Sequence, residues 1–149
     1  MNQNSPIVIG CDHAAVALKD IIKAYLVDKA GIEVKDVGTF TADSVDYPDY
    51  AVQVAKAVSD GTYARGILLC GTGIGMSMAA NRFPRVRAAL CSDLFAARLS
   101  RQHNNANILV MGGRVIGDIL AIEILKTWLE TPFEGGRHQS RLDKFDQVC

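Results

Sequence analysis

The chain has 149 residues, of which 49% are hydrophobic and 21% charged, a balance typical of one globular domain with a buried core. Its formal net charge of zero argues against a general nucleic-acid-binding protein, and no apolar run approaches the roughly 20 residues of a membrane-spanning helix. The short polar start lacks the basic and apolar regions of a signal peptide, so we expect a cytoplasmic protein with no membrane or nucleic-acid partner.

Apolar runs and helical repeats alternate along the whole chain, with no linker or low-complexity segment between them. Expected strands are short apolar runs at 7–10, 33–37, 66–70, 86–91 and 107–111. Expected helices follow them at 18–30, 46–60, 76–80, 93–102, 118–130 and from about residue 139. This alternation predicts a five-stranded parallel sheet between two helical layers, a Rossmann-like three-layer αβα sandwich that forms a single domain over residues 1–149.

The residues that follow the expected strands are rich in glycine and in polar or titratable side chains. They are Cys11-Asp12-His13, Gly38-Thr39, Cys70-Gly71-Thr72-Gly73, Cys91-Ser92-Asp93 and Gly112-Gly113-Arg114. Ligands of open parallel sheets bind beyond the carboxyl ends of the strands. We therefore expect the functional site at this edge of the sheet.

The charges are distributed unevenly along the chain. Residues 1–64 hold five lysines, nine acids and no arginine, for a net charge of −4. Residues 65–149 hold nine arginines, two lysines and seven acids, for a net charge of +4. Guanidinium groups match phosphate geometry, so the second part indicates a small anionic ligand, unless its arginines only form a solvated surface. Arg137 and Arg141 are four residues apart, so they would share one face of a helical turn and could clamp a phosphate.

A glycine-rich loop, Gly71-Thr72-Gly73-Ile74-Gly75, joins the third expected strand to a helix. Glycines allow close backbone approach, and the N–H groups at a helix start point at whatever binds there, so the loop could hold an anion or an oxyanion. A dinucleotide-binding loop would need another glycine where Met76 stands. Asp93, 22 residues after Gly71, lies near the spacing of a ribose-binding acid and keeps that alternative open.

Cys70 is the last residue of the third expected strand, directly before the glycine-rich loop. Amide dipoles and a helix start would stabilise a thiolate there, although a buried structural cysteine is an equal alternative. The four cysteines, at 11, 70, 91 and 149, form no C-x-x-C pair, which argues against a zinc knuckle or a redox dithiol.

Two histidines and an aspartate are further candidates for chemistry. His13 and Asp12 follow the first expected strand, where Asp12 could simply cap the helix, and His103 ends a helix, where it could simply complement the helix dipole. No pair of histidines has the i,i+4 spacing of a zinc-binding helix, so we expect neither a metal nor another cofactor.

Taken together, these residues resemble the ribose-5-phosphate isomerase B family, which also includes galactose-6-phosphate and allose-6-phosphate isomerases. The matching segments run in order through nearly the whole chain: Gly10-Cys11-Asp12-His13, Asp46-Tyr47-Pro48, Cys70-Gly71-Thr72-Gly73-Ile74-Gly75, Ser100-Arg101-Gln102-His103-Asn104-Asn105-Ala106-Asn107, Gly113-Arg114 and Phe133-Glu134-Gly135-Gly136-Arg137-His138. Ala14-Ala15 replaces glycines that are common in the family, which could reshape the mouth of the site, and Pro84 is a loop variation.

The resemblance implies an aldose–ketose isomerase that works through an enediolate. Cys70 would move the carbon-bound proton, His103 would open the sugar ring as an acid and base, and Asp12 would handle hydroxyl protons. The hydroxyl group of Thr72 and the N–H groups of residues 71–75, including Gly73 and Gly75, would stabilise the enediolate oxygen. Some family members use a glutamate base, but no acid follows Thr72 here, so the chain is of the cysteine type.

The resemblance also implies how the substrate is held. Tyr47 and Asn104 would orient the sugar, and the phosphate would contact His13, Arg114, Arg137 and Arg141. The partner would be a second copy of the chain, in a homodimer or a tetramer whose sites join Cys70 of one subunit to His103 of another. The sequence leaves the substrate open between a pentose 5-phosphate and a hexose 6-phosphate.

Two other function classes remain open on the residues alone. A hydrolase could use Cys70 and His103 for covalent catalysis, and it would form a thioester with acyl substrates. A nucleotide-binding module could use the glycine-rich loop without doing any chemistry.

Overall fold

The computed structural model describes residues 5–146, so Cys149 lies outside the described part of the chain. The strands are β1 Ile7–Cys11, β2 Val34–Asp36, β3 Arg65–Cys70, β4 Ala88–Leu90 and β5 Ile108–Gly112. The helices are α1 Val16–Ala24, α2 Tyr47–Ser59, α3 Ile74–Ala80, α4 Leu94–Gln102, α5 Asp118–Glu130 and α6 Arg137–Phe145. A 3₁₀ turn precedes α1 at His13–Ala15, and a π-helical segment extends it over Tyr25–Lys29.

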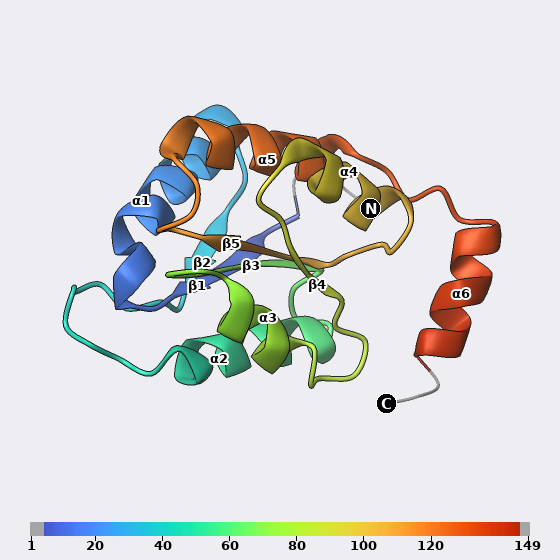
Figure 1. The fold of residues 1–149 in the computed structure, drawn as a ribbon, viewed down its shortest axis with the longest axis horizontal. Coiled ribbons are helices and arrows are strands. Elements are labelled where there is room, and N and C mark those ends of the chain that lie inside the picture. The colour runs from blue at the N-terminus through green and yellow to red at the C-terminus, as the bar shows by residue number, and fades with distance from the viewer. Residues whose placement is uncertain (1–4, 147–149) are drawn as a thin grey trace.

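The five strands form one parallel sheet in the order β2-β1-β3-β5-β4. Helices α1, α4 and α5 cover one face of the sheet, α2 and α3 cover the other, and α6 stands at one end of the molecule (Figure 1). The predicted three-layer sandwich with a five-stranded parallel sheet is therefore confirmed.

Two strands are shorter than the sequence predicts. β2 and β4 span three residues each instead of 33–37 and 86–91, because both are edge strands and pair with a single neighbour over three positions. The last helix begins at Arg137 rather than near residue 139. Gly135 and Gly136 precede it with φ of 64° and 54°, and this left-handed turn redirects the chain into the helix earlier than polarity alone suggests.

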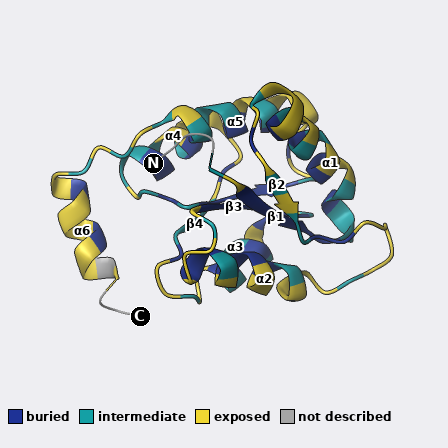
Figure 2. Ribbon diagram, turned by 180° about the vertical axis from the view of Figure 1, so that it is seen from behind, coloured by how far each residue is buried: buried dark blue, intermediate teal, exposed yellow. Residues whose placement is uncertain are grey.

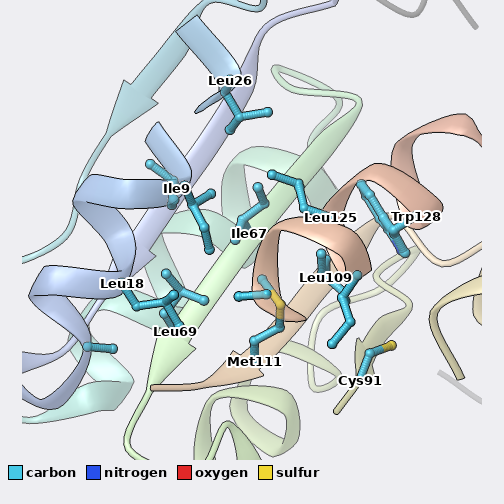
Figure 3. Packing of buried hydrophobic residues seen from close by; sticks show 14 of the residues in the cluster. Ile9, Leu18, Leu26, Ile67, Leu69, Cys91, Leu109, Met111, Leu125 and Trp128 are labelled. Carbon is cyan, nitrogen blue, oxygen red and sulfur yellow. The ribbon is translucent and has the colours of Figure 1, made fainter. Parts of the chain in front are cut away.

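Alternate residues of the central strands pack into two separate cores. Ile9, Ile67 and Leu109 join the core under α1 and α5, together with the fully buried Trp128 (Figure 3). Their neighbours Leu68 and Cys70 face the other core, under α2 and α3. The central strands β1, β3 and β5 are buried, whereas the outer sides of the helices are exposed (Figure 2). Strand alternation thus directs the Cys70 side chain toward α3.

No helix within residues 5–146 has the length and apolar character needed to cross a membrane.

Candidate active site

A cavity of about 230 Å³ lies at the carboxyl edge of the sheet, where the loops after β1, β3 and β5 meet. Its walls are formed by Asp12, His13, Ala14, Tyr47, Cys70, Gly71, Thr72, Gly75 and Arg114. β1 lies between β2 and β3, so the chain runs from β1 to β2 on one side and then crosses to β3 on the other side. The loops that follow β1 and β3 therefore diverge and leave a crevice between them, and parallel sheets bind ligands in such a crevice.

The Cys70 sulfur sits at the base of this crevice and is held by the glycine-rich loop. Gly73 donates its backbone N–H to Cys70 Sγ over 3.0 Å. The loop can turn this tightly because Gly73 has a φ of 81°, and a Cβ atom there would lie 2.4 Å from Leu90 Cδ1. Cys70 is 5% exposed, so the sulfur is shielded from bulk water and fixed in position.

The loops after β3 and β5 are tied together by backbone hydrogen bonds. Gly113 donates its N–H to the Cys70 carbonyl oxygen over 2.8 Å, and Arg114 donates its N–H to the Gly71 carbonyl oxygen over 3.0 Å. A Cβ atom at Gly71 would lie 3.5 Å from Arg114 Cδ, so the arginine side chain runs past the loop at van der Waals distance. Arg114 and Cys70 therefore line the same crevice.

Asp12 and His13 complete the other wall of the crevice. The buried Asp12 carboxylate accepts a hydrogen bond from Ala14 N–H over 2.9 Å, so it does cap the turn that leads into α1. His13 Nδ1 accepts a hydrogen bond from the backbone N–H of Val45 over 3.2 Å. A neutral imidazole that accepts at Nδ1 carries its proton at Nε2, so His13 presents a hydrogen-bond donor to a ligand.

The Tyr47 ring lies directly against the backbone of Gly75. A Cβ atom at Gly75 would lie 2.6 Å from Tyr47 Cζ and 3.0 Å from its hydroxyl oxygen. The first residue of α2 therefore packs on the first turn of α3, and a side chain at position 75 would push the ring out of the crevice.

Gly75→Ala should destabilise the protein by about 1–3 kcal/mol, the usual cost of overpacking, because the new methyl group and the Tyr47 ring cannot occupy the same space. Thermal unfolding measures this cost. Gly117→Ala is the matched control, since no atom lies within 4 Å of the Cβ position there. Removing the ring in a Gly75→Ala/Tyr47→Ala double variant should restore most of the loss. A single variant as stable as the parent would contradict the packing described here.

A second group of predicted residues lies at a different cavity, of about 650 Å³, between the end of α4, β4 and α6. Its walls are formed by Asn81, Arg87, Ala88, Ala89, Ser100, His103, Asn104, Ala106, His138, Arg141 and Leu142. None of the described residues lines both cavities. A single chain thus places Cys70, Asp12, Thr72 and Arg114 in one cavity and His103, Asn104 and Arg141 in another, with Arg137 exposed at the start of α6.

His138 is buried, although its neighbours Arg137 and Arg141 on α6 are exposed. Its ring stacks on that of His103, with centroids 4.1 Å apart and planes inclined by 9°. Burial lowers the pKa of His138 below its usual value, and the charges of His103 and Arg137 lower it further. The buried His138 therefore contributes less positive charge to this part of α6 than the exposed Arg137 and Arg141 do.

Glu134 was overlooked as a side chain of the candidate site. Its Oε2 atom lies 3.5 Å from His138 Nε2 and 4.0 Å from His103 Nε2. The signal in the sequence is the i,i+4 spacing of Glu134 and His138, which pairs of histidines alone do not reveal.

The dinucleotide-binding alternative depended on Asp93, which has a structural role. Asp93 accepts a hydrogen bond from Ala96 N–H over 2.8 Å and caps α4. Met76, which stands where a third glycine would be needed, is fully buried in the core under α3.

Comparisons with known proteins identify the family of the chain. A model of the ribose/galactose isomerase family matches residues 7–145. Ribose-5-phosphate isomerase B of Escherichia coli is 51% identical over 142 residues, which cover 95% of each chain. D-erythrulose-4-phosphate isomerase of Pectobacterium atrosepticum is 46% identical over 93% of this chain and 91% of its own. The solved structure of a ribose 5-phosphate isomerase from Thermotoga maritima is 56% identical, with a TM-score of 0.93 over 97% of this chain and 99% of that one.

Proposed function

Because this chain belongs to the ribose/galactose isomerase family, we propose that it interconverts ribose 5-phosphate and ribulose 5-phosphate in the cytoplasm, without a metal or another cofactor. The observation that carries this proposal is the Cys70 sulfur, held by Gly73 N–H inside a crevice that also contains Asp12 and Thr72. This arrangement supports a site in which Cys70 is the base, Asp12 carries protons and the loop at Thr72 stabilises an oxyanion.

The reaction is a proton transfer between two neighbouring carbons of the open-chain sugar. The Cys70 thiolate takes the proton from C2 of the aldose, and the electron pair of that C–H bond passes into the carbonyl group at C1 to give an enediolate. Cys70 then returns a proton to C1, while Asp12 moves a proton between the two oxygens. N–H groups of the loop at 71–75 and the Thr72 hydroxyl stabilise the negative oxygen, because fixed dipoles in a shielded site do not need to reorganise.

The phosphate is proposed to lie between two sets of donors. His13 and Arg114 lie in the crevice with Cys70, and the hydrogen bond from Val45 leaves His13 Nε2–H free to donate to a phosphate oxygen. Arg137 and Arg141 are four residues apart on α6, and Arg141 lines the larger cavity together with His103. Guanidinium groups bind phosphate through paired, charge-assisted hydrogen bonds.

The separation of the two cavities supports a homodimer in which each site takes Cys70 from one subunit and His103 from the other. The carboxyl edge of the sheet and the first turns of the helices there expose large apolar side chains: Ile74, Met78, Leu90, Leu94, Phe95, Val115, Ile119 and Leu120. Ile119 is 84% exposed and Phe95 69%. A second copy would bury these side chains and bring its larger cavity against the crevice, and a tetramer would preserve the same pairing.

Arg137→Ala and Arg141→Ala should each raise the KM for the sugar phosphate roughly 10- to 100-fold, because each loses a charge-assisted hydrogen bond worth about 1.5–3 kcal/mol. The ratio of kcat/KM for the phosphorylated sugar to kcat/KM for the free sugar should fall by the same factor. Lys144→Ala is the matched control, since Lys144 is an exposed cation on the same helix that does not line the cavity. An unchanged preference in both arginine variants would mean that they form only a solvated basic face.

The substrate is tested by comparing kcat/KM for ribose 5-phosphate, allose 6-phosphate, galactose 6-phosphate and erythrulose 4-phosphate. We expect the highest value for ribose 5-phosphate. A clear preference for a hexose 6-phosphate would mean that the proposed reaction type is right and the proposed substrate is wrong. Absence of turnover with all four, together with a thioester burst on acyl substrates, would favour a hydrolase.

A further inference from the structure

Two imidazole groups and one carboxylate converge beside the larger cavity, from three parts of the chain. His103 follows the last turn of α4, Glu134 lies in the loop between α5 and α6, and His138 is in the first turn of α6. The ligand atoms of these three side chains all lie within 4.8 Å of one another. The shortest separation, between His138 Nε2 and Glu134 Oε2, is 3.5 Å.

We propose that His103, Glu134 and His138 form a binding site for Zn²⁺ or a similar transition-metal ion, and that occupation of this site inhibits the enzyme. Two histidines and one glutamate, with a fourth position open to water, are an established ligand set for zinc in proteins. The ion in this proposal is an inhibitor and takes no part in the isomerisation. The inhibition rests on the proposed function, whereas the binding does not.

The cluster needs only small side-chain movements to hold an ion. Ligand atoms at about 2.0–2.2 Å from a tetrahedral zinc are about 3.4 Å apart, which the pair His138 and Glu134 nearly meets already. The side chains of His103 and Glu134 are 37% and 49% exposed, so both can turn toward the ion. The His138 side chain, 6% exposed, would serve as the fixed ligand. The stacked His103 ring would tilt so that its Nε2 lone pair points at the metal.

The ligand atoms of the cluster select the class of ion. They are two imidazole nitrogens and one carboxylate oxygen. Mg²⁺ and Ca²⁺ prefer several oxygen ligands and find one carboxylate in the cluster. Imidazole nitrogens instead suit zinc, nickel and cobalt, whose affinity comes from nitrogen coordination.

Inhibition follows from the role proposed for His103. An acid and base for ring opening must exchange a proton at a free imidazole nitrogen. A metal ion on Nε2 occupies that lone pair, and it also fixes the loop at Glu134 beside the cavity. Chelators should therefore leave the activity unchanged or raise it, and added Zn²⁺ should lower it.

Calorimetric titration of metal-free protein with ZnCl₂ tests the binding. We expect one site per chain, an affinity at least about tenfold weaker in Glu134→Gln and His138→Gln, and no comparable binding of MgCl₂. Glu130→Gln and His13→Gln are the matched controls, because they remove a glutamate and a histidine outside the cluster. Visible absorption of bound Co²⁺ reports the same ligands independently, and its spectrum should change in Glu134→Gln but not in Glu130→Gln.

Three results would overturn the proposal: no zinc binding to the parent protein, equal affinity in all four variants, or binding that is lost in Cys70→Ser and kept in Glu134→Gln. Initial rates of isomerisation, measured with and without Zn²⁺, show which of the two proposals fails. An active enzyme that binds no zinc, or that binds it without loss of activity, refutes the inhibitory site alone. A protein that binds zinc through the cluster but isomerises no sugar phosphate refutes the proposed function alone.

Discussion

Replacing Cys70 with alanine should abolish isomerisation, with a loss in kcat of at least roughly 100- to 10,000-fold, the contribution of a positioned general base. Cys70 Sγ is the acceptor of the Gly73 N–H and the atom that the crevice presents to a ligand, so the loss should appear mainly in kcat. The fold should survive, because the substitution removes one sulfur atom at the end of β3 and keeps the backbone hydrogen bonds from Gly113 to Cys70 and from Arg114 to Gly71. Steady-state kinetics and circular dichroism measure the two effects.

Cys91→Ala is the matched control for this experiment. Cys91 follows β4, is 1% exposed, and has a pKa that burial raises to about 11, so its thiol stays protonated near neutral pH. The control variant should keep nearly full activity. Substantial turnover in a well-folded Cys70→Ala variant would remove Cys70 from its proposed role as the base.

The second prediction is that two inactive variants recover activity when they are mixed. Cys70→Ser and His103→Asn should each be inactive, and mixing equal amounts after reversible dissociation should restore about a quarter of the parent activity. Random exchange makes about half of the dimers mixed, and in a two-fold dimer with shared sites each mixed dimer has one site with both residues and one with neither. The separate cavities for Cys70 and His103 within one chain motivate this expectation.

Mixing Cys70→Ser with Cys70→Ala is the control, because no arrangement of these subunits contains an intact Cys70. Exchange itself is followed with a mass-labelled subunit. If subunits demonstrably exchange and no activity returns in the first mixture, Cys70 and His103 act in sites that one chain builds alone.

The layered fold could be predicted from the sequence because its signals are local. Buried parallel strands appear as apolar runs, and the helix expected at 118–130 coincides with α5, Asp118–Glu130. The strand order could not be predicted, since β5 inserts between β3 and β4 through contacts that periodicity does not encode. The two edge strands were predicted too long for a related reason: pairing partners, and not apolar character, determine where a strand ends.

The candidate site could likewise be predicted only in part from the sequence. The crevice around Cys70 follows from one rule, that the ends of parallel strands meet at one edge, and the residues after β1, β3 and β5 do line it. The contact between His13 and Val45 spans 32 positions in the chain, and the Glu134 side chain reaches His103 from another loop. Such contacts depend on how loops fold over the sheet, which residue spacing does not reveal.

The most direct test of the account is to run the reaction with ribose 5-phosphate in D₂O and to follow the carbon-bound hydrogens by proton NMR. Transfer through the Cys70 thiol and an enediolate predicts that solvent deuterium enters C1 of the ketose and C2 of the aldose in the parent protein, and that neither position exchanges in Cys70→Ala. Ribulose 5-phosphate formed with complete retention of the original hydrogen in the parent protein, together with undiminished turnover in Cys70→Ala, would indicate a direct hydride shift and would contradict the proposed mechanism.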